Sequence, residues 1–293
     1  MEAINLDLFG DPVIEKNDLR KKYVVPPFSV LDTVSGEWQS RKDMWRGLGI
    51  KSEVGRKATT FNMYEWNKNN NASEMPPDTS IFDPVLCEIM YKWFAPKRGS
   101  ILDPFAGGSV RGIVANYLGY DYTGIELREE QVYANMQQGI DIVPDNTPTW
   151  IIGDSNNVMD TMDRKFDFIF TCPPYYDLEK YSSDRRDLSH MDEREFNWAY
   201  RSIIKKSCIL LKDNSFACFV VGNVRNKKGF IRDLVGLTVK SFEDNGVHYY
   251  NDLILRQVVG SGSMRADGNM KYKKIVKMHQ NVLVFCKGDP KLR

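Results

Sequence analysis

The sequence has no long apolar run and no secretory start. Its longest apolar stretches are the size of a strand, as at 216–221, whereas a membrane-spanning helix needs about 20 apolar residues. The first residues, MEAINLDLFGDP, are acidic and lack the basic start and apolar stretch of a signal peptide. These absences argue against a membrane protein and a secreted protein. We therefore expect a cytoplasmic protein.

Residues that bind metals are also few and widely spaced. The five cysteines, at positions 87, 172, 208, 218 and 286, have no CxxC spacing, and an odd number does not indicate a disulfide framework. The three histidines, His190, His248 and His279, form no HExxH pattern. We expect no metal site.

Net charge is nearly absent as well, with 40 Lys and Arg against 39 Asp and Glu. One segment departs from this balance. From Arg256 to Lys277 there are six basic residues and one acidic residue, Asp267. Such a run is typical either of a surface that binds a polyanion or of a solvated loop.

Strand-like and helix-like segments alternate from about residue 80 onwards. Strands are expected at 100–102, 122–126, 150–152, 166–171, 216–221, 249–255 and 281–286, and helices at 80–94, 109–118, 129–138, 193–211 and 231–245. The last two strands are joined without a helix. This order predicts a doubly wound α/β domain over residues 79–293, with a mostly parallel seven-stranded sheet and helices on both faces.

Residues 1–78 are irregular in pattern and are expected to form an N-terminal extension. Aromatic and basic residues are interleaved over residues 38–66. Such a mixture suits a segment that contacts nucleic acid, because cations meet phosphates and rings stack on bases. It equally suits an extension whose rings pack against the main domain. The aromatic residues concerned are Trp38, Trp45, Phe61, Tyr64 and Trp66.

A glycine turn follows the first strand of the domain. Open α/β sheets bind ligands at the carboxyl ends of their strands. At this place the chain reads Asp103, Pro104, Phe105, Ala106, Gly107, Gly108 and Ser109. Glycines let the backbone approach a ligand closely, and the following helix offers free N–H groups. The turn is neither a phosphate-binding loop of kinases nor the GxGxxG turn of dehydrogenases.

Two carboxylates follow the next two strands. Glu126 ends the second strand, where a carboxylate can accept hydrogen bonds from both hydroxyls of a ribose. Asp154 follows the third strand and can accept from an adenine amino group. Each has a plainer interpretation: Glu126 as a surface carboxylate, Asp154 as a helix cap.

A proline pair follows the fourth strand, in the segment Thr171-Cys172-Pro173-Pro174-Tyr175. Prolines fix the backbone and have no N–H, so the carbonyls before and between them remain free to accept. These carbonyls can hold a planar amino group while Tyr175 stacks on its ring. A purely structural turn is the alternative.

Together, the glycine turn and the proline pair resemble the cofactor-binding and catalytic motifs of DNA amino-methyltransferases, in which the catalytic motif usually reads Asp, Asn or Ser, then Pro-Pro, then Tyr, Phe or Trp. The resemblance covers about residues 78–288 and includes Phe82-Asp83-Pro84 and the final strand. Residues 25–50 are similar, less securely, to phage and prophage members. The resemblance implies a Rossmann-like class I methyltransferase fold in a bacterial or phage-infected cell.

The resemblance further implies S-adenosylmethionine as the methyl donor. The residues implied to hold it are Ser80, Phe82, Asp103, Pro104, Phe105, Ala106, Gly107, Gly108, Ser109, Glu126, Leu127, Asp154 and Ser155. A base flipped out of double-stranded DNA would be methylated on its amino group, held by the Cys172 carbonyl, Pro173, Pro174 and Tyr175. The implied phosphate contacts are Arg256, Arg265, Lys271, Lys273, Lys274 and Lys277.

Cys172 departs from the family pattern, which has Asp, Asn or Ser at this position. In enzymes that methylate the cytosine ring, the nucleophilic cysteine follows a proline, and a Glu-Asn-Val element comes later. Here Cys172 precedes the prolines and the element is not present, so a nucleophilic cysteine is not favoured. Cysteine resembles serine in size, and Ser-Pro-Pro-Tyr is frequent among cytosine enzymes. Adenine enzymes are the larger group, so adenine N6 is slightly favoured over cytosine N4.

Alternatives remain open: an RNA or protein methyltransferase, or an inactive relative that only binds DNA. The two motifs lie only about 60 residues apart, which leaves no room for a recognition domain between them. We therefore expect short or relaxed sequence specificity. Recognition would come from residues 1–78, from 177–192 or from the basic segment. The sequence leaves open whether the protein is a monomer or a homodimer, and whether it serves restriction-modification or phage self-protection.

Overall fold

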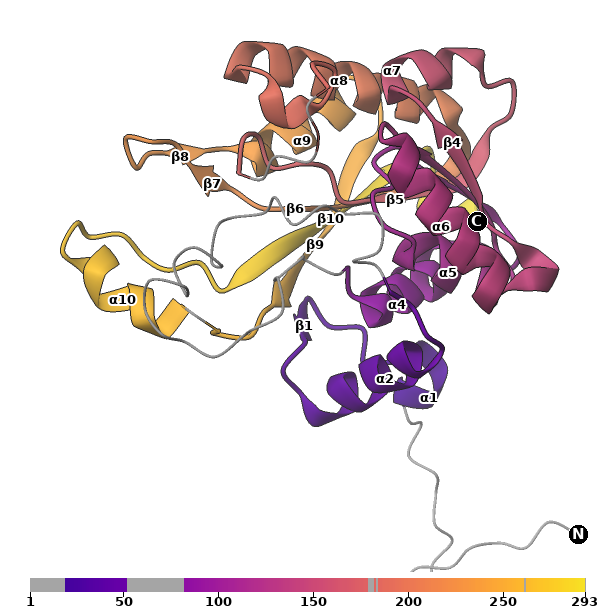
Figure 1. The fold of residues 1–293 in the computed structure, drawn as a ribbon, viewed down its shortest axis with the longest axis horizontal. Helices are drawn as coiled ribbons and strands as arrows, with labels where there is room; N and C mark the ends of the chain where they lie inside the picture. Colours follow the sequence, from indigo (N-terminus) through magenta and orange to yellow (C-terminus); the bar gives the residue numbers. More distant parts are fainter. Residues whose placement is uncertain (1–18, 52–81, 179–181, 183, 261, 293) are drawn as a thin grey trace, which may run out of the picture.

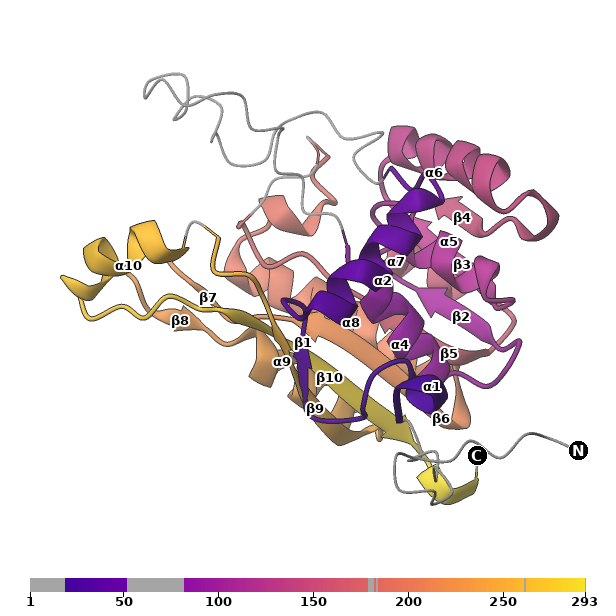
Figure 2. The same ribbon diagram turned by 90° about the horizontal axis from the view of Figure 1, so that it is seen from below.

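The computed structural model describes residues 19–51, 82–178, 182, 184–260 and 262–292. Helices cover both faces of a central sheet whose strand order is β1-β9-β10-β6-β5-β2-β3-β4 (Figures 1 and 2). The strands are β1 (Val30–Asp32), β2 (Ser100–Asp103), β3 (Asp121–Glu126), β4 (Thr149–Ile152), β5 (Phe166–Thr171), β6 (Leu211–Val221), β9 (His248–Arg256) and β10 (His279–Lys287). Only β10 runs antiparallel to its neighbours in this sheet, which confirms the expected mostly parallel α/β architecture.

The helices follow the expected alternation. They are α1 (Leu19–Tyr23), α2 (Gly36–Gly47), α4 (Pro84–Phe94), α5 (Val110–Tyr117), α6 (Glu129–Ile142), α7 (Ser155–Val158), α8 (Glu193–Leu210), α9 (Leu234–Glu243) and α10 (Gly262–Met270). Short 3-10 turns lie at Pro144–Asn146, Met159–Thr161, Leu188–His190 and Pro290–Leu292. Two strands outside the main sheet, β7 (Val224–Arg225) and β8 (Ile231–Arg232), form a hairpin.

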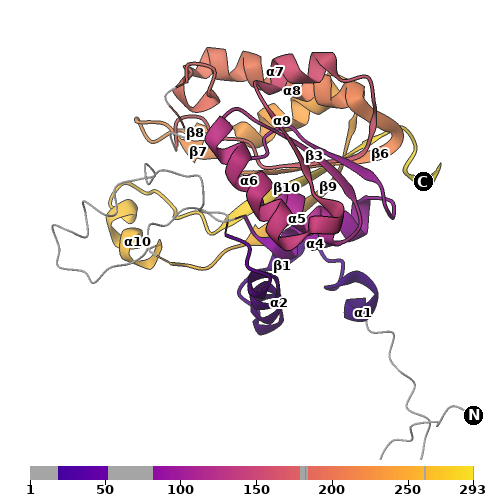
Figure 3. The ribbon, with the colours of Figure 1, turned by 45° about the vertical axis from the view of Figure 1, so that its right-hand side comes forward.

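The sheet separates two apolar cores. In β5, Phe168 and Phe170 pack with residues of α4 and α5, whereas Ile169 packs with residues of α8 and α9. This alternation follows from the two-residue period of a strand, and it requires helices on both faces. Figure 3 shows α4, α5 and α6 on one side of the strands and α8 and α9 on the other.

The sheet has one strand more than the seven expected. Val30–Asp32 pairs in parallel with the end of β9 and becomes the edge strand β1. A side-chain ion pair between Asp32 and Arg256, at 2.8 Å, joins the same two strands. Three residues are too few for a periodic pattern, so this strand was not visible in the sequence.

Part of the N-terminal extension is regular and packs on the domain. Trp38 and Trp45 of α2 are buried in the core that α4 and α5 share. The indole N–H of Trp45 donates to Glu88 at 3.0 Å. For these two rings the packing interpretation is therefore the correct one. Phe61, Tyr64, Trp66 and the expected domain boundary at residue 78 lie outside the described residues.

The Glu88 carboxylate fastens α2 to α4. It is almost fully buried, and it accepts hydrogen bonds from Arg41 at 2.7 Å and from Lys92 at 2.7 Å. Burial on its own would raise the pKa of Glu88, but these hydrogen bonds and that of Trp45 hold the pKa below its ordinary value. Glu88 is thus a charged anchor between α2 and α4, beside the apolar contacts of Trp38 and Trp45.

Two helix starts differ from the expected bounds. The helix expected from residue 80 begins at Pro84, because Asp83 caps it by accepting from the Val85 N–H. The helix expected from residue 231 begins three residues later, because Ile231 and Arg232 pair with β7 instead.

Among the described residues, no helix is long and apolar enough to cross a bilayer. The same residues contain no cluster of three or more His, Cys, Asp or Glu side chains placed to hold a metal ion.

Candidate active site

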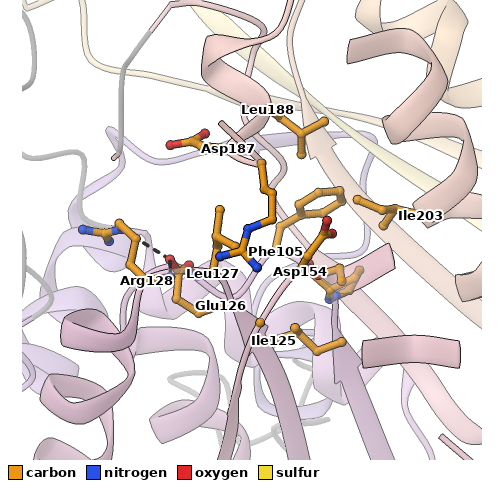
Figure 4. Close-up of a pocket in the computed structure, with 14 residues that line it drawn as sticks. Phe105, Ile125, Glu126, Leu127, Arg128, Asp154, Asp187, Leu188 and Ile203 are labelled. Atoms are coloured by element: carbon orange, nitrogen blue, oxygen red, sulfur yellow. Dashed lines mark hydrogen bonds and ion pairs between the residues drawn. The ribbon is translucent and has the colours of Figure 1, made fainter. Parts of the chain in front are cut away.

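A pocket opens at the carboxyl ends of β2, β3 and β4, where the glycine turn and the two carboxylates were expected to meet (Figure 4). Seven of the thirteen residues predicted for the cofactor line it. They are Pro104, Phe105, Gly107, Glu126, Leu127, Asp154 and Ser155. The structure thus brings together residues from three strand ends, as the topology of an open α/β sheet requires.

Asp103 points away from the pocket and into the protein. It is fully buried, and its carboxylate accepts hydrogen bonds from Arg111 at 2.6 Å and from Tyr122 at 2.8 Å. The Arg111 guanidinium also donates to the carbonyls of Phe105 and Ala106. Burial lowers the pKa of Arg111, but the charge and hydrogen bond of Asp103, together with the neighbouring Tyr122 and Cys172, hold this pKa above its ordinary value. Asp103 and Arg111 therefore shape the glycine turn from below.

Glu126 is oriented by the glycine turn itself. Its carboxylate accepts from the Gly107 N–H at 2.9 Å and from the Arg128 N–H at 3.0 Å. Gly107 has a φ of +53°, a conformation that favours glycine. A Cβ on Gly124 would lie 2.8 Å from the Ala106 Cβ, so glycine also lets β3 pack closely under the turn. The turn and the carboxylate are therefore one rigid unit.

Asp154 and Ser155 have structural roles in addition to their place in the pocket wall. The Asp154 carboxylate caps α7 by accepting from the Asn156 N–H at 2.9 Å, as its plainer interpretation stated. The Ser155 hydroxyl donates to the Pro104 carbonyl at 2.5 Å and so ties α7 to the glycine turn.

Of the other predicted cofactor residues, those that the structure describes do not line the pocket wall. Ala106 and Ser109 are buried. Phe82 packs its ring against Phe170, and the Arg111 guanidinium lies 4.5 Å from the centre of the Phe82 ring. Ser80 lies outside the described residues.

Seven residues of the pocket were missed by sequence reasoning: Ile125, Arg128, Gly153, Arg186, Asp187, Leu188 and Ile203. Arg186 and Leu188 come from the segment 177–192, which was expected to contribute to target recognition. The structure places part of that segment over the pocket. Arg186 pairs with Asp184 at 2.6 Å and lowers the pKa of that carboxyl to about 2. No motif marks this segment, so only the fold could find it.

The proline pair lies at the end of β5. Pro173 is buried and Tyr175 is half-buried. The Tyr175 hydroxyl donates to the Val220 carbonyl at 3.3 Å and accepts from the Gln280 amide at 3.1 Å. Because Val220 and Gln280 belong to β6 and β10, two neighbouring strands fix the direction of the phenol ring.

A side-chain hydrogen bond joins the two motifs. Thr171, the last residue of β5, donates from its hydroxyl to Asp103 at 2.6 Å. The same carboxylate also accepts from the Phe105 N–H of the glycine turn at 3.2 Å. The glycine turn and the proline pair are therefore built on one buried carboxylate, which fixes their relative position.

The predicted phosphate contacts lie in different settings. Arg256 pairs with Asp32 on β1, whereas Arg265, Lys271 and Lys273 are exposed on or next to α10. Lys277 lies near the proline pair, because Lys277 and Tyr175 both approach Gly222. A Cβ on Gly222 would lie 3.2 Å from the Lys277 Nζ and 3.5 Å from the Tyr175 ring. Partial burial lowers the pKa of Lys277.

No protein-family model matches the sequence, and no curated protein matches it either. Solved structures do match the fold. A Pyrococcus horikoshii protein suggested to be an RNA methyltransferase aligns with a TM-score of 0.50 at 13% identity, over 86% of this chain and 100% of that one. Magnesium protoporphyrin IX methyltransferase from Synechocystis, solved with bound SAH, aligns with a TM-score of 0.50 at 11% identity, over 85% of this chain and 99% of that one.

A third structure, TrmN from Thermus thermophilus, aligns with a TM-score of 0.49 at 13% identity, and the match covers 70% of this chain and only 49% of TrmN. The identities are low, so the two likenesses with a TM-score of 0.50 establish the fold alone. That fold is the Rossmann-like class I methyltransferase fold, as predicted.

Proposed function

From a class I methyltransferase fold as the premise, we propose that the protein transfers a methyl group from S-adenosylmethionine to the exocyclic amino group of a nucleic-acid base. The observation that carries this proposal is the Thr171–Asp103 contact at 2.6 Å, since it fixes a proline pair with a tyrosine beside a glycine-turn pocket. Neither motif alone indicates amino-methylation. Side by side at adjacent strand ends, they supply the two half-sites that the reaction needs.

The pocket fits the cofactor in charge and polarity. Glu126 lines the pocket at the end of β3, and a carboxylate there can accept hydrogen bonds from ribose hydroxyls. Phe105, Leu127 and Ile203 supply apolar walls for an adenine ring, and Asp154 supplies an acceptor beside them. When bound, S-adenosylmethionine would supply an electrophilic methyl group.

The protein's own contribution is to hold the target amino group. The carbonyls of Cys172 and Pro173 lie at the proline pair, and carbonyl oxygens are the acceptors that the two N–H bonds of an amino group need. Tyr175 offers a ring face for the base. The Cys172 Sγ lies 3.7 Å from the Tyr175 hydroxyl, so this thiol is in contact with the ring that would hold the base. The proposal requires no nucleophilic cysteine.

Double-stranded DNA is the proposed substrate, with adenine N6 slightly favoured over cytosine N4. The exposed cations on and near α10 support a polyanion, and the pattern of the proline motif supports an amino group on a base. RNA is the second candidate, because one structure of matching fold is a suggested RNA methyltransferase.

The test is mass spectrometry of nucleosides from DNA and, separately, from RNA, each incubated with the protein and S-adenosylmethionine. Methyladenine or N4-methylcytosine on DNA is the expected product. Methylation of RNA alone would replace the substrate but keep the reaction. Cofactor binding without any methylated nucleoside would overturn the proposal.

Glu126→Gln is expected to weaken S-adenosylmethionine binding by about 10- to 100-fold. The carboxylate accepts charge-assisted hydrogen bonds, which contribute about 1.5–3 kcal/mol each, and an amide replaces one of its acceptor oxygens with a donor. Isothermal titration calorimetry measures the change. Glu129→Gln, at the exposed start of α6, is the matched control and should bind as the wild type does. Equal affinities for the wild type and Glu126→Gln would remove Glu126 from the cofactor site.

A further inference from the structure

The hairpin formed by β7 and β8 is strongly basic, although sequence analysis did not single it out. Residues 223–232 contain four Lys or Arg and no acidic residue. Lys227 and Lys228 stand at the turn and are exposed. In Figures 1 and 3 this hairpin and α10 project from the same side of the molecule. Two basic elements far apart in the sequence therefore extend in one direction.

The turn of the hairpin is tightly built. The Asn226 side chain accepts from the N–H groups of Lys228 and Phe230, both at 3.0 Å. The Asn226 N–H donates to the Phe230 carbonyl at 2.9 Å, and Arg225 donates to the Gly229 carbonyl at 2.7 Å. The turn is thus held in one conformation and presents Phe230 at a defined place.

Phe230 is 69% exposed at this turn, although it is among the most apolar residues of the chain. Ile231 beside it is 59% exposed. Apolar side chains on a basic projection are typical of proteins that insert a wedge between base pairs. A solvated hairpin would not need them.

The two basic elements touch each other. Lys274, from the segment between α10 and β10, lies over the hairpin turn: its Cε is 2.9 Å from the position that a Cβ on Gly229 would take. The exposed Tyr272 lies two residues before Lys274 in the chain, and the centre of its ring is 5.7 Å from the Lys274 ammonium. Cations and rings of both elements thus belong to one surface.

The base of the hairpin is fixed to the segment that follows the proline pair. Arg232 forms ion pairs with Asp177 and, at 3.3 Å, with Glu193. Its guanidinium also lies 3.7 Å from the centre of the Tyr176 ring, and Tyr176 directly follows Tyr175. The hairpin therefore has a set position relative to the place where the target base would be held.

We propose that the β7–β8 hairpin is a wedge that enters duplex DNA beside the target nucleotide. Phe230 fills the space that the flipped base leaves, and Lys227 and Lys228 bind the flanking phosphates. This inference rests on the proposed function. To the proposed function, the hairpin adds a second contact surface for DNA and a residue that compensates for the loss of stacking when the base leaves the helix.

The first experiment compares methylation of two duplexes, one with the target base paired and one with an abasic site opposite it. Phe230→Ala is expected to lower kcat/KM about tenfold on the paired duplex, but less than about twofold on the other, because an unpaired base costs less to extrude. Trp198→Ala, a change of an equally exposed ring on α8, should leave both rates unchanged. An equal loss on both duplexes, or no loss, would overturn the wedge.

The second experiment measures binding to a fluorescent duplex and needs no methyl transfer. The double variant Lys227→Glu, Lys228→Glu should bind at least about tenfold more weakly and with a smaller salt dependence. The double variant Lys165→Glu, Lys205→Glu changes two exposed lysines elsewhere and is the control. Binding that depends on the hairpin, without methylation, would contradict the proposed function and keep the hairpin as a DNA contact. If DNA is methylated and neither Phe230→Ala nor the Lys227→Glu, Lys228→Glu double variant changes binding or methylation, the wedge is overturned and the proposed function stands.

Discussion

Tyr175→Ala is expected to lower methyl transfer by about 100-fold, because the target base loses the ring on which it stacks. Stacking of one base on an aromatic side chain contributes about 1–3 kcal/mol, and alanine also leaves Gln280 without the hydroxyl to which it donates at 3.1 Å. Single-turnover methylation of DNA, read by mass spectrometry of nucleosides, measures the loss. The affinity for S-adenosylmethionine should stay within about twofold of wild type, since Tyr175 is not part of the cofactor pocket wall.

Tyr175→Phe separates the ring from its hydroxyl. It keeps the stacking face and removes the hydrogen bonds to Val220 and Gln280, each of about 0.5–1.5 kcal/mol. We expect it to retain most of the activity that alanine loses. If phenylalanine and alanine at this position were equally inactive, the hydroxyl and not the ring would be the essential group, and the stacking role would be wrong.

Arg111→Met is expected to lower the free energy of unfolding by about 3–5 kcal/mol, the usual cost of breaking a buried ion pair on one side. The pair is almost inaccessible, with 6% of the Arg111 side chain and none of the Asp103 side chain exposed. The substitution would leave a buried carboxylate without its cation and the Phe105 and Ala106 carbonyls without their donor. Urea denaturation followed by tryptophan fluorescence measures the loss.

The matched control is Arg164→Met, which removes the exposed partner of Asp121 at 2.9 Å. An exposed ion pair contributes about 0–1 kcal/mol, so the control should unfold near the wild-type midpoint. Similar losses in both variants would show that the buried network has no special role. Where enough Arg111→Met protein remains folded, its cofactor affinity should also fall, because the glycine turn has lost its support.

The fold and the two motifs could be predicted because they are written in local sequence. A glycine turn after a strand and a proline pair before a tyrosine constrain the backbone where they stand. The alternation of strands and helices from residue 80 was sufficient for seven of the eight strands of the sheet. Side-chain partners far apart in sequence left no such trace. Nothing local shows that Asp103 turns inward to meet Arg111, Tyr122 and Thr171.

The same reasoning explains what was missed in the pocket. Arg186 and Leu188 belong to a stretch without strand or helix periodicity, so its place over the strand ends depends on tertiary packing alone. Ile203 looks in the sequence like any apolar residue of an amphipathic helix.

The edge strand β1 has a practical consequence for anyone who divides this chain. A fragment that starts at residue 79 would retain both motifs but would lose Val30–Asp32 and α2. The backbone groups of β9 that pair with β1 would then face solvent, and the α4 surface that receives Trp38 and Trp45 would be bare. An open strand edge beside an uncovered apolar patch is a template for pairing between molecules. Such a fragment is expected to self-associate, and the folding unit is expected to include β1 and α2.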